Sequence, residues 1–201
     1  MSSLKAILTG DIVHSRKVSS EIWLSVLTDC LRHYSNKFDI FRGDSFQIEL
    51  PLEKCIEAVF YIKASIRTIE KLDVRLGLGI GKIEVERQHV KDSSGEAYIF
   101  SGEAFDTLDK ELIRVRSPFD HWDESTNIML QLATELANRW TVNMAKTVKT
   151  AIEHPEASQL ELTKLLHRKH QSQISTELKK ANWQKIKLTI EYCTKQLLIT
   201  C

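Results

Sequence analysis

The spacing of apolar and polar positions changes several times over the first two thirds of the chain. Short stretches in which apolar and polar residues alternate are followed by longer stretches with apolar residues at helical spacing. Between two of the alternating stretches, Arg42-Gly43-Asp44 is typical of a hairpin turn, because glycine and aspartate tolerate turn conformations. The order β-α-β-β-α-β predicts a ferredoxin-like, split-βαβ sheet of the α/β (α+β) class. The predicted strands are residues 4–13, 38–41, 45–50 and 74–85, and the predicted helices are residues 22–34 and 52–71.

The last of these strands has glycine at every second position. Gly77, Gly79 and Gly81 share one face of the strand, and the leucines and isoleucine between them lie on the other. A face without side chains leaves the backbone open to close approach by a helix, a ligand or another strand. The pattern is not a dinucleotide-binding fingerprint, because it lies inside a strand rather than at a strand–helix junction.

Beyond residue 100 the pattern predicts helices. Ser101 can cap a helix that runs to Leu112, and residues 117–124 are typical of a linker. From residue 127 onward the period is helical throughout, and two short helices are joined by a basic turn at 168–170, as in a helix-turn-helix. We therefore expect a palm-like domain over 1–120 and an all-helical domain over 121–201. The helices predicted in the second domain cover residues 128–136, 140–152, 159–167, 171–181 and 183–198.

Composition excludes several classes of protein. A chain of 201 residues, 42% of them hydrophobic and 27% charged, can bury an ordinary core. Only seven glycines and three prolines are present, and no apolar run approaches the ~18 residues of a bilayer span. The first eleven residues do not resemble a secretory signal, so we expect a cytoplasmic protein without a membrane partner. The four cysteines lack zinc-binding spacing and are expected to be free and mostly buried: Cys30, Cys55, Cys193 and Cys201.

The charge is unevenly distributed. Residues 138–201 contain eleven Lys and Arg and five Asp and Glu, which gives a net charge of +6. Residues 1–137 contain 17 Lys and Arg and 22 Asp and Glu, which gives a net charge of −5. A basic tail attracts a polyanion. A recognition helix needs short polar side chains at its start, for base edges, and cations beside them, for phosphates. The candidate contacts to double-stranded DNA are Arg168, Lys169, Gln171, Ser172, Gln173, Ser175, Thr176, Lys179 and Lys180.

Two carboxylates are candidates for chemistry in the first domain. Asp11 lies near the end of the first predicted strand, and Asp44 lies in the hairpin turn. The first strand and the hairpin are neighbours in a split-βαβ sheet, so the two carboxylates can converge on one or two divalent cations. Taken singly, Asp11 also fits an ordinary strand-end residue, and Asp44 an ordinary turn residue.

Four motifs resemble the class III nucleotidyl cyclase domain and its polymerase-like palm relatives. They are AILTGDIVHS at 6–15, FRGDSF at 41–46, VRLGLGIGK at 74–82 and GEAFD at 102–106, and the whole chain, with its terminal helices, resembles bacterial SatD-type proteins. The resemblance implies that Asp11 and Asp44 bind Mg²⁺ or Mn²⁺ together with the Ile12 carbonyl. It also implies a nucleotide-binding set of Val13, His14, Ser15, Arg42 and Gly43.

The chain departs from the cyclase pattern after Gly102. Asp106 and Lys110 occupy the places where such cyclases have asparagine and arginine. An acid repels the ribose-phosphate region, and lysine lacks the bidentate fork of arginine, so Lys110 is a weak catalytic candidate. The sequence therefore favours a homodimeric DNA-binding regulator whose first domain binds a nucleotide without turning it over. The alternatives are an active metal-dependent nucleotidyl cyclase or nucleotidyltransferase that uses Asp11 and Asp44, and a scaffold whose tail contacts protein or RNA.

Overall fold

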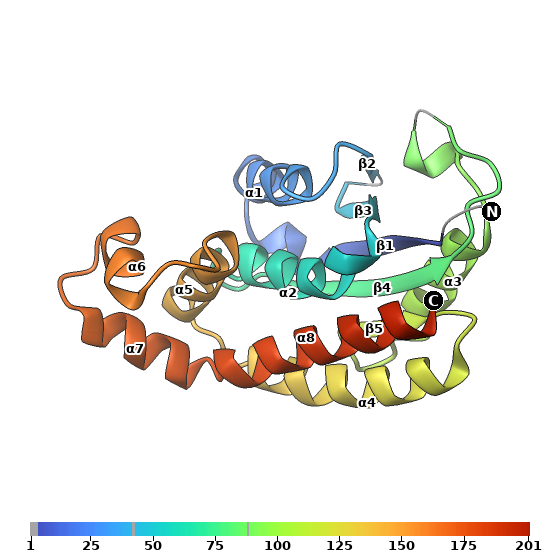
Figure 1. The fold of residues 1–201 in the computed structure, drawn as a ribbon. Helices are drawn as coiled ribbons and strands as arrows, with labels where there is room; N and C mark the ends of the chain where they lie inside the picture. The colour runs from blue at the N-terminus through green and yellow to red at the C-terminus, as the bar shows by residue number, and fades with distance from the viewer. Residues whose placement is uncertain (1–3, 42, 88) are drawn as a thin grey trace.

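A five-stranded sheet forms the centre of the molecule (Figure 1). The computed structural model describes residues 4–41, 43–87 and 89–201. The strand order is β2-β3-β1-β4-β5, in which the first four strands pair antiparallel and β5 pairs parallel with β4. The predicted β-α-β-β-α-β order is confirmed. The strands are β1 (Lys5–Val13), β2 (Phe38–Phe41), β3 (Ser45–Leu50), β4 (Asp73–Gly81) and β5 (Ile113–Arg116).

Helices cover both faces of the sheet. α1 (Ser20–Arg32) and α2 (Cys55–Ile66) lie on one face, where Leu76, Leu78 and Ile80 join the main apolar core. α3 (Glu96–Asp106) covers the other face, against β4, β1 and β5. Three short 3₁₀ helices connect these elements: η1 (Ser15–Lys17), η2 (Leu52–Lys54) and η3 (Val90–Asp92).

The glycine face of β4 is covered by a helix. A Cβ atom placed on Gly77 would lie 2.4 Å from the Phe105 nitrogen, and one placed on Gly79 would lie 2.2 Å from the Ala97 carbonyl oxygen. Both neighbours are backbone atoms of α3. Of the three occupants that the sequence left open, the structure shows the helix, because only glycine lets the α3 backbone lie directly on the strand.

Two predictions between residues 95 and 124 are wrong. Ser101 does not begin a helix: it is buried inside α3, which starts after Gly95 at φ 147° and ends at Asp106. Residues 107–112 then return to the sheet edge and lead into β5, which the sequence analysis missed. The predicted linker over 117–124 contains the first turn of α4 (Asp120–Ala137), where the Ser117 N–H donates to the Asp123 carboxylate at 2.7 Å.

The remaining helices confirm the predicted ones closely. They are α5 (Val142–Glu153), α6 (Gln159–Leu165), α7 (Gln171–Lys180) and α8 (Trp183–Thr200). Local caps account for this agreement: the Thr141 side chain accepts from the Met144 N–H, and Ser158 forms a capping box with Glu161. No helix in the described ranges is long and apolar enough to cross a bilayer.

The apolar core is continuous across residue 120. Trp122, Trp140 and Ile186 of the helical part belong to the same buried cluster as the sheet residues. The Trp140 indole N–H donates to the Ala181 carbonyl at 2.9 Å, and the Trp122 indole N–H donates to the Cys193 carbonyl at 3.1 Å. The division into domains at 1–120 and 121–201 stays a prediction. All four cysteines are free, and three of them are buried, as expected: Cys30, Cys55 and Cys193.

Candidate functional site

Asp11 and Asp44 line one open pocket of about 480 Å³. Asp11 lies opposite Ser45 in the β1–β3 ladder, and the Ile12 N–H donates to the Asp44 carbonyl at 3.2 Å. These backbone contacts place the β2–β3 turn beside the end of β1. The rest of the lining is Ile12, Val13, His14, Ser15, Arg16, Lys17, Arg75 and Leu112.

An arginine that the sequence analysis did not select completes this pocket. Arg75 lies opposite Asp11 in the β1–β4 ladder, and its guanidinium donates to both Asp11 carboxylate oxygens, with Nε 2.9 Å from Oδ1. It also lies over the Phe105 ring, with Cζ 5.4 Å from the ring centroid. The hydrogen bond to Asp11 raises the pKa of Arg75, and the charge of Asp44 acts in the same direction. The sequence signal was its place on the glycine face of β4, two residues before Gly77.

The donor set of the pocket fits a hard divalent cation only with help from a ligand. Two carboxylates and a backbone carbonyl suit Mg²⁺ or Mn²⁺, which takes one or two protein carboxylates and completes its shell with phosphate and water. Among the described residues, no group of three His, Cys, Asp or Glu side chains lies close enough to hold an ion alone. Asp11 pairs with Arg75, and Asp44 accepts a hydrogen bond from the Ser15 hydroxyl. A metal bound here would need further oxygen ligands from water or from a bound molecule.

Most of the predicted nucleotide-binding residues lie around this pocket. His14 has left-handed backbone, at φ 64°, and leads into η1, whose three residues line the pocket. Gly43 has φ 90° and lines an adjoining hollow of about 380 Å³ with Ser15 and Asp44. Arg42 lies outside the described residues.

Lys110 lies in a different pocket. It is exposed in the turn between α3 and β5 and lines a hollow of about 370 Å³ with Gln131, Leu132 and Glu135 of α4. Asp106 is exposed at the last residue of α3. Within one chain, the structure therefore does not bring Lys110 to Asp11 and Asp44.

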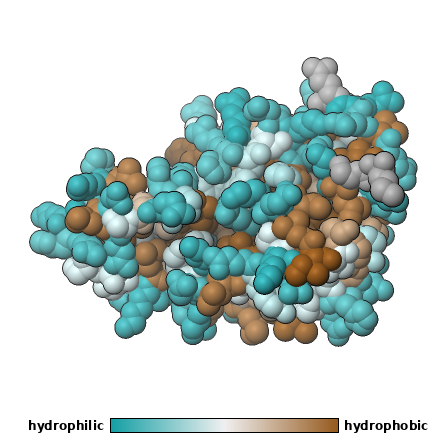
Figure 2. All heavy atoms as spheres, in the orientation of Figure 1, coloured by the Kyte–Doolittle hydropathy of each residue, from teal (hydrophilic) through white to brown (hydrophobic). Residues whose placement is uncertain are grey.

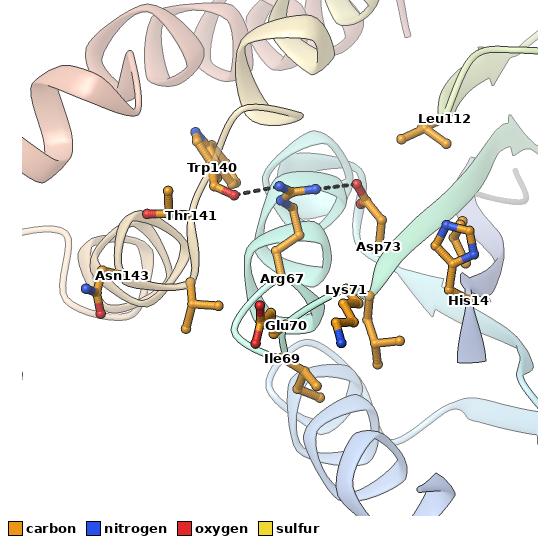
Figure 3. Close-up of a pocket in the computed structure, with 13 residues that line it drawn as sticks. His14, Arg67, Ile69, Glu70, Lys71, Asp73, Leu112, Trp140, Thr141 and Asn143 are labelled. Carbon is orange, nitrogen blue, oxygen red and sulfur yellow. Dashed lines mark hydrogen bonds and ion pairs between the residues drawn. The ribbon is translucent and has the colours of Figure 1, made fainter. Parts of the chain in front are cut away.

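A larger pocket of about 650 Å³ adjoins the first and shares Val13, His14 and Leu112 with it. Figure 3 shows Arg67 between Asp73 and Trp140 in this pocket. The Arg67 guanidinium donates to the Asp73 carboxylate at 2.7 Å and to the Trp140 carbonyl at 2.5 Å. Its contacts join the start of β4 to the turn between α4 and α5.

Asp73 also neutralises a fully buried lysine. The Lys63 ammonium lies 2.8 Å from the Asp73 carboxylate, and its side chain has no exposed surface. Burial lowers the pKa of Lys63, and the charge of Asp73 opposes that shift. The Asp73 carboxylate therefore offsets part of the cost of burying the Lys63 ammonium.

The predicted DNA-contacting residues lie mostly on one exposed helix face. In α7 only Ile174 is buried, and in Figure 1 α6 and α7 form the end of the molecule farthest from the N-terminus. His167, in the turn before α7, has left-handed backbone at φ 50°, a conformation that glycine adopts more easily. The exposed candidates are Lys169, Gln171, Ser172, Gln173, Ser175, Thr176, Lys179 and Lys180.

Three of these nine candidates have partners inside the chain: the Gln171 side-chain amide donates to the Gln159 side-chain oxygen at 3.5 Å, and the other two are Arg168 and Gln173. The Arg168 guanidinium is half-buried and pairs with the Glu177 carboxylate at 3.1 Å, so it holds the turn against α7. The Gln173 side-chain oxygen accepts from the Lys169 and His170 backbone N–H groups, each at 3.1 Å, and caps the start of α7. The other six side chains are exposed at the surface.

A search with models of known protein families finds no match, and a search of curated proteins finds none either. Among solved structures, the chain is similar to a bacterial light-regulated adenylyl cyclase, with 15% sequence identity and a TM-score of 0.39. The alignment covers 57% of this chain and 44% of the cyclase chain, so this chain spans less than half of that protein. At this identity and TM-score the similarity says nothing about activity or substrate.

Proposed function

We propose that the protein is a DNA-binding transcriptional regulator of the SatD type, in which α6 and α7 form a helix-turn-helix and α7 enters the major groove. The observation that carries this proposal is the exposure of Gln171, Ser172, Ser175 and Thr176 over the first half of α7. Exposed lysines lie at both ends of the same helix, where the phosphates of a duplex would run. The regulator acts as a homodimer in the cytoplasm.

Duplex binding tests this proposal. Duplexes are selected from a random library, and the dissociation constant of the best one is measured by fluorescence anisotropy at several salt concentrations. Lys179→Ala is expected to reduce the slope of log affinity against log salt by about 1, because one phosphate contact is lost. Gln171→Ala is expected to cost about 1–3 kcal/mol for the selected duplex and to relax its sequence preference.

The matched control is Lys54→Ala, which removes an exposed lysine of η2 and is expected to leave the slope unchanged. Failure to enrich any duplex, or an affinity that does not depend on salt, would contradict the proposal. Tighter binding of RNA than of duplex DNA would instead assign the tail to RNA.

We also propose that the pocket at Asp11 and Asp44 binds the phosphates of a nucleotide together with Mg²⁺ or Mn²⁺, without turnover. Two carboxylates, the Arg75 guanidinium and the exposed cations Arg16 and Lys17 line the same pocket, which supports recognition of a metal–phosphate complex. The placement of Lys110 in another hollow supports binding without turnover. An active cyclase or nucleotidyltransferase is the alternative.

Calorimetric titration with each nucleoside triphosphate, with and without Mg²⁺ or Mn²⁺, tests the pocket. Binding is expected only with metal, and Asp44→Asn is expected to weaken it at least tenfold. Asp109→Asn, which removes an exposed acid outside the pocket, is the control. Absence of metal-dependent binding would refute the proposal. A cyclic or phosphodiester product that disappears in Asp44→Asn would establish the enzyme instead.

A further inference from the structure

Large apolar side chains are exposed along the outer faces of α4 and α8. Leu132 is 66% exposed and Ile199 is 67% exposed, and contiguous apolar patches of this kind mark interaction sites, whereas single exposed residues do not. On α4 the exposed residues Ile128 and Leu132 lie opposite the buried positions of the same helix. The full set is Ile128 and Leu132 on α4 with Leu188, Tyr192, Leu198 and Ile199 on α8.

The two helices lie side by side, so their exposed residues form one surface. The Trp122 indole of α4 donates to the Cys193 carbonyl of α8, and Tyr192 lines a hollow of about 480 Å³ together with Phe119 and Trp122. Figure 1 places α4 and α8 along the lower side of the molecule, and Figure 2 shows apolar side chains at that lower edge. We call this surface, made of the six residues above, the α4/α8 face.

The charges around the α4/α8 face differ in sign between its two helices. α4 contains four acids and no Lys or Arg, whereas α8 contains three lysines and one acid. Glu124 and Glu135 are exposed on α4, and Lys185 and Lys195 are exposed on α8. Over the described residues, no ion pair joins an acid of α4 to a lysine of α8. These charges are therefore available to a partner.

We propose that a second copy of this chain covers the α4/α8 face, with α4 of one protomer against α8 of the other around a two-fold axis. A two-fold interface pairs each surface with its own copy, so an acidic helix beside a basic one is self-complementary: the contact between α4 of one protomer and α8 of its partner occurs twice in the dimer. Burial of exposed Leu132, Leu188 and Tyr192 supplies the apolar centre of such an interface. The proposal names the surface of the homodimer and stands whether or not the chain binds DNA or a nucleotide.

Molecular mass in solution tests the surface. Light scattering after gel filtration, and analytical ultracentrifugation over a range of concentrations, are expected to give twice 23.1 kDa for the natural chain. Leu132→Glu and Leu188→Glu are each expected to raise the dimer dissociation constant at least tenfold. The matched control is Ile99→Glu, which places the same charge on a residue of α3 that is 60% exposed, and it is expected to leave the dimer unchanged. Far-UV circular dichroism checks that each variant is folded.

A charge-reversal pair makes the test specific to two-fold docking. One variant carries Glu124→Lys and Glu135→Lys, which puts lysines at the exposed positions of both helices, and the other carries Lys185→Glu and Lys195→Glu, which puts acids at the exposed positions of both. Each is expected to be monomeric alone, and an equimolar mixture is expected to form a heterodimer, because both contacts become attractive. A natural chain that stays monomeric up to about 100 μM would overturn the proposal, because the dimer dissociation constant would then lie above that concentration. So would a dimer that withstands Leu132→Glu and Leu188→Glu, or one that Ile99→Glu breaks equally.

Discussion

Replacing Gly79 by alanine probes the contact between β4 and α3 most directly. The added Cβ would lie 2.2 Å from both the Ala97 carbonyl oxygen and the Ser101 nitrogen. Both atoms belong to helix backbone, so no side chain can turn aside, and α3 would have to withdraw by about 1 Å to restore ordinary contact. Overpacking of this kind costs roughly 1–3 kcal/mol, and the rigid neighbour puts Gly79→Ala at the upper end, about 3 kcal/mol.

Urea and thermal unfolding followed by circular dichroism measure this loss. For a chain of this length, about 3 kcal/mol corresponds to a fall in Tm of roughly 6–12 °C. Gly102→Ala is the matched control, because nothing lies within 4 Å of its Cβ position and the residue is inside α3. There alanine is expected to stabilise the protein by about 1 kcal/mol, since it is the better helix former. A Gly79→Ala variant as stable as the natural chain would refute the close packing of α3 on β4.

Three further outcomes follow from buried polar groups and thiols. Asp73→Asn is expected to destabilise the fold by about 3 kcal/mol in urea unfolding, because it leaves the buried Lys63 ammonium unpaired, and Lys63→Met is expected to cost much less. Because burial lowers the pKa of Lys63 below its ordinary 10.5, the folded chain binds fewer protons than the unfolded chain just below that pH. The stability of the natural chain relative to Lys63→Met should therefore rise as the pH rises toward 10.5, and a fall would contradict the assignment. Finally, Ellman's reagent is expected to modify only the exposed Cys201 quickly in the native protein, and all four cysteines in denaturant. The reason is that burial raises the pKa values of the Cys30 and Cys55 thiols to about 12, so that the reactive thiolate is scarce. Rapid reaction of all four cysteines in the native protein would disprove this burial.

The elements with local signals were predictable, and those without them were not. Gly43 and Asp44 marked the hairpin between β2 and β3, and the helical spacing of apolar residues marked α5 and α6, whose caps at Thr141 and Ser158 the structure shows. By contrast, β5 has only four residues, and its hydrogen-bonding partner β4 lies more than thirty residues earlier. Nothing in its immediate neighbourhood distinguishes such a strand from the end of a helix.

The candidate site also contains both residues that the sequence could predict and contacts that it could not. Asp11 and Asp44 could be selected from the sequence because each stands at the end of a readable element. Arg75 has a sequence signal in its place on the glycine face, but its pairing with Asp11 could not be predicted, because that pairing depends on the register of β1 against β4. A shift of that register by one residue would place Arg75 on the opposite face, and local spacing contains no information on register.

The sequence by itself determined most of the strands and helices, with β5 and the starts of α3 and α4 as exceptions, and it showed a strand with one bare face and a tail rich in cations. Only the tertiary structure decided that α3 packs on Gly77 and Gly79, that Arg75 forms an ion pair with Asp11, and that α4 and α8 expose apolar residues. Periodicity and turn residues act over a few neighbouring positions, and so they are visible in the chain. Which faces meet depends on burying apolar surface between segments that are far apart in the sequence, and that balance is settled only when the whole chain packs.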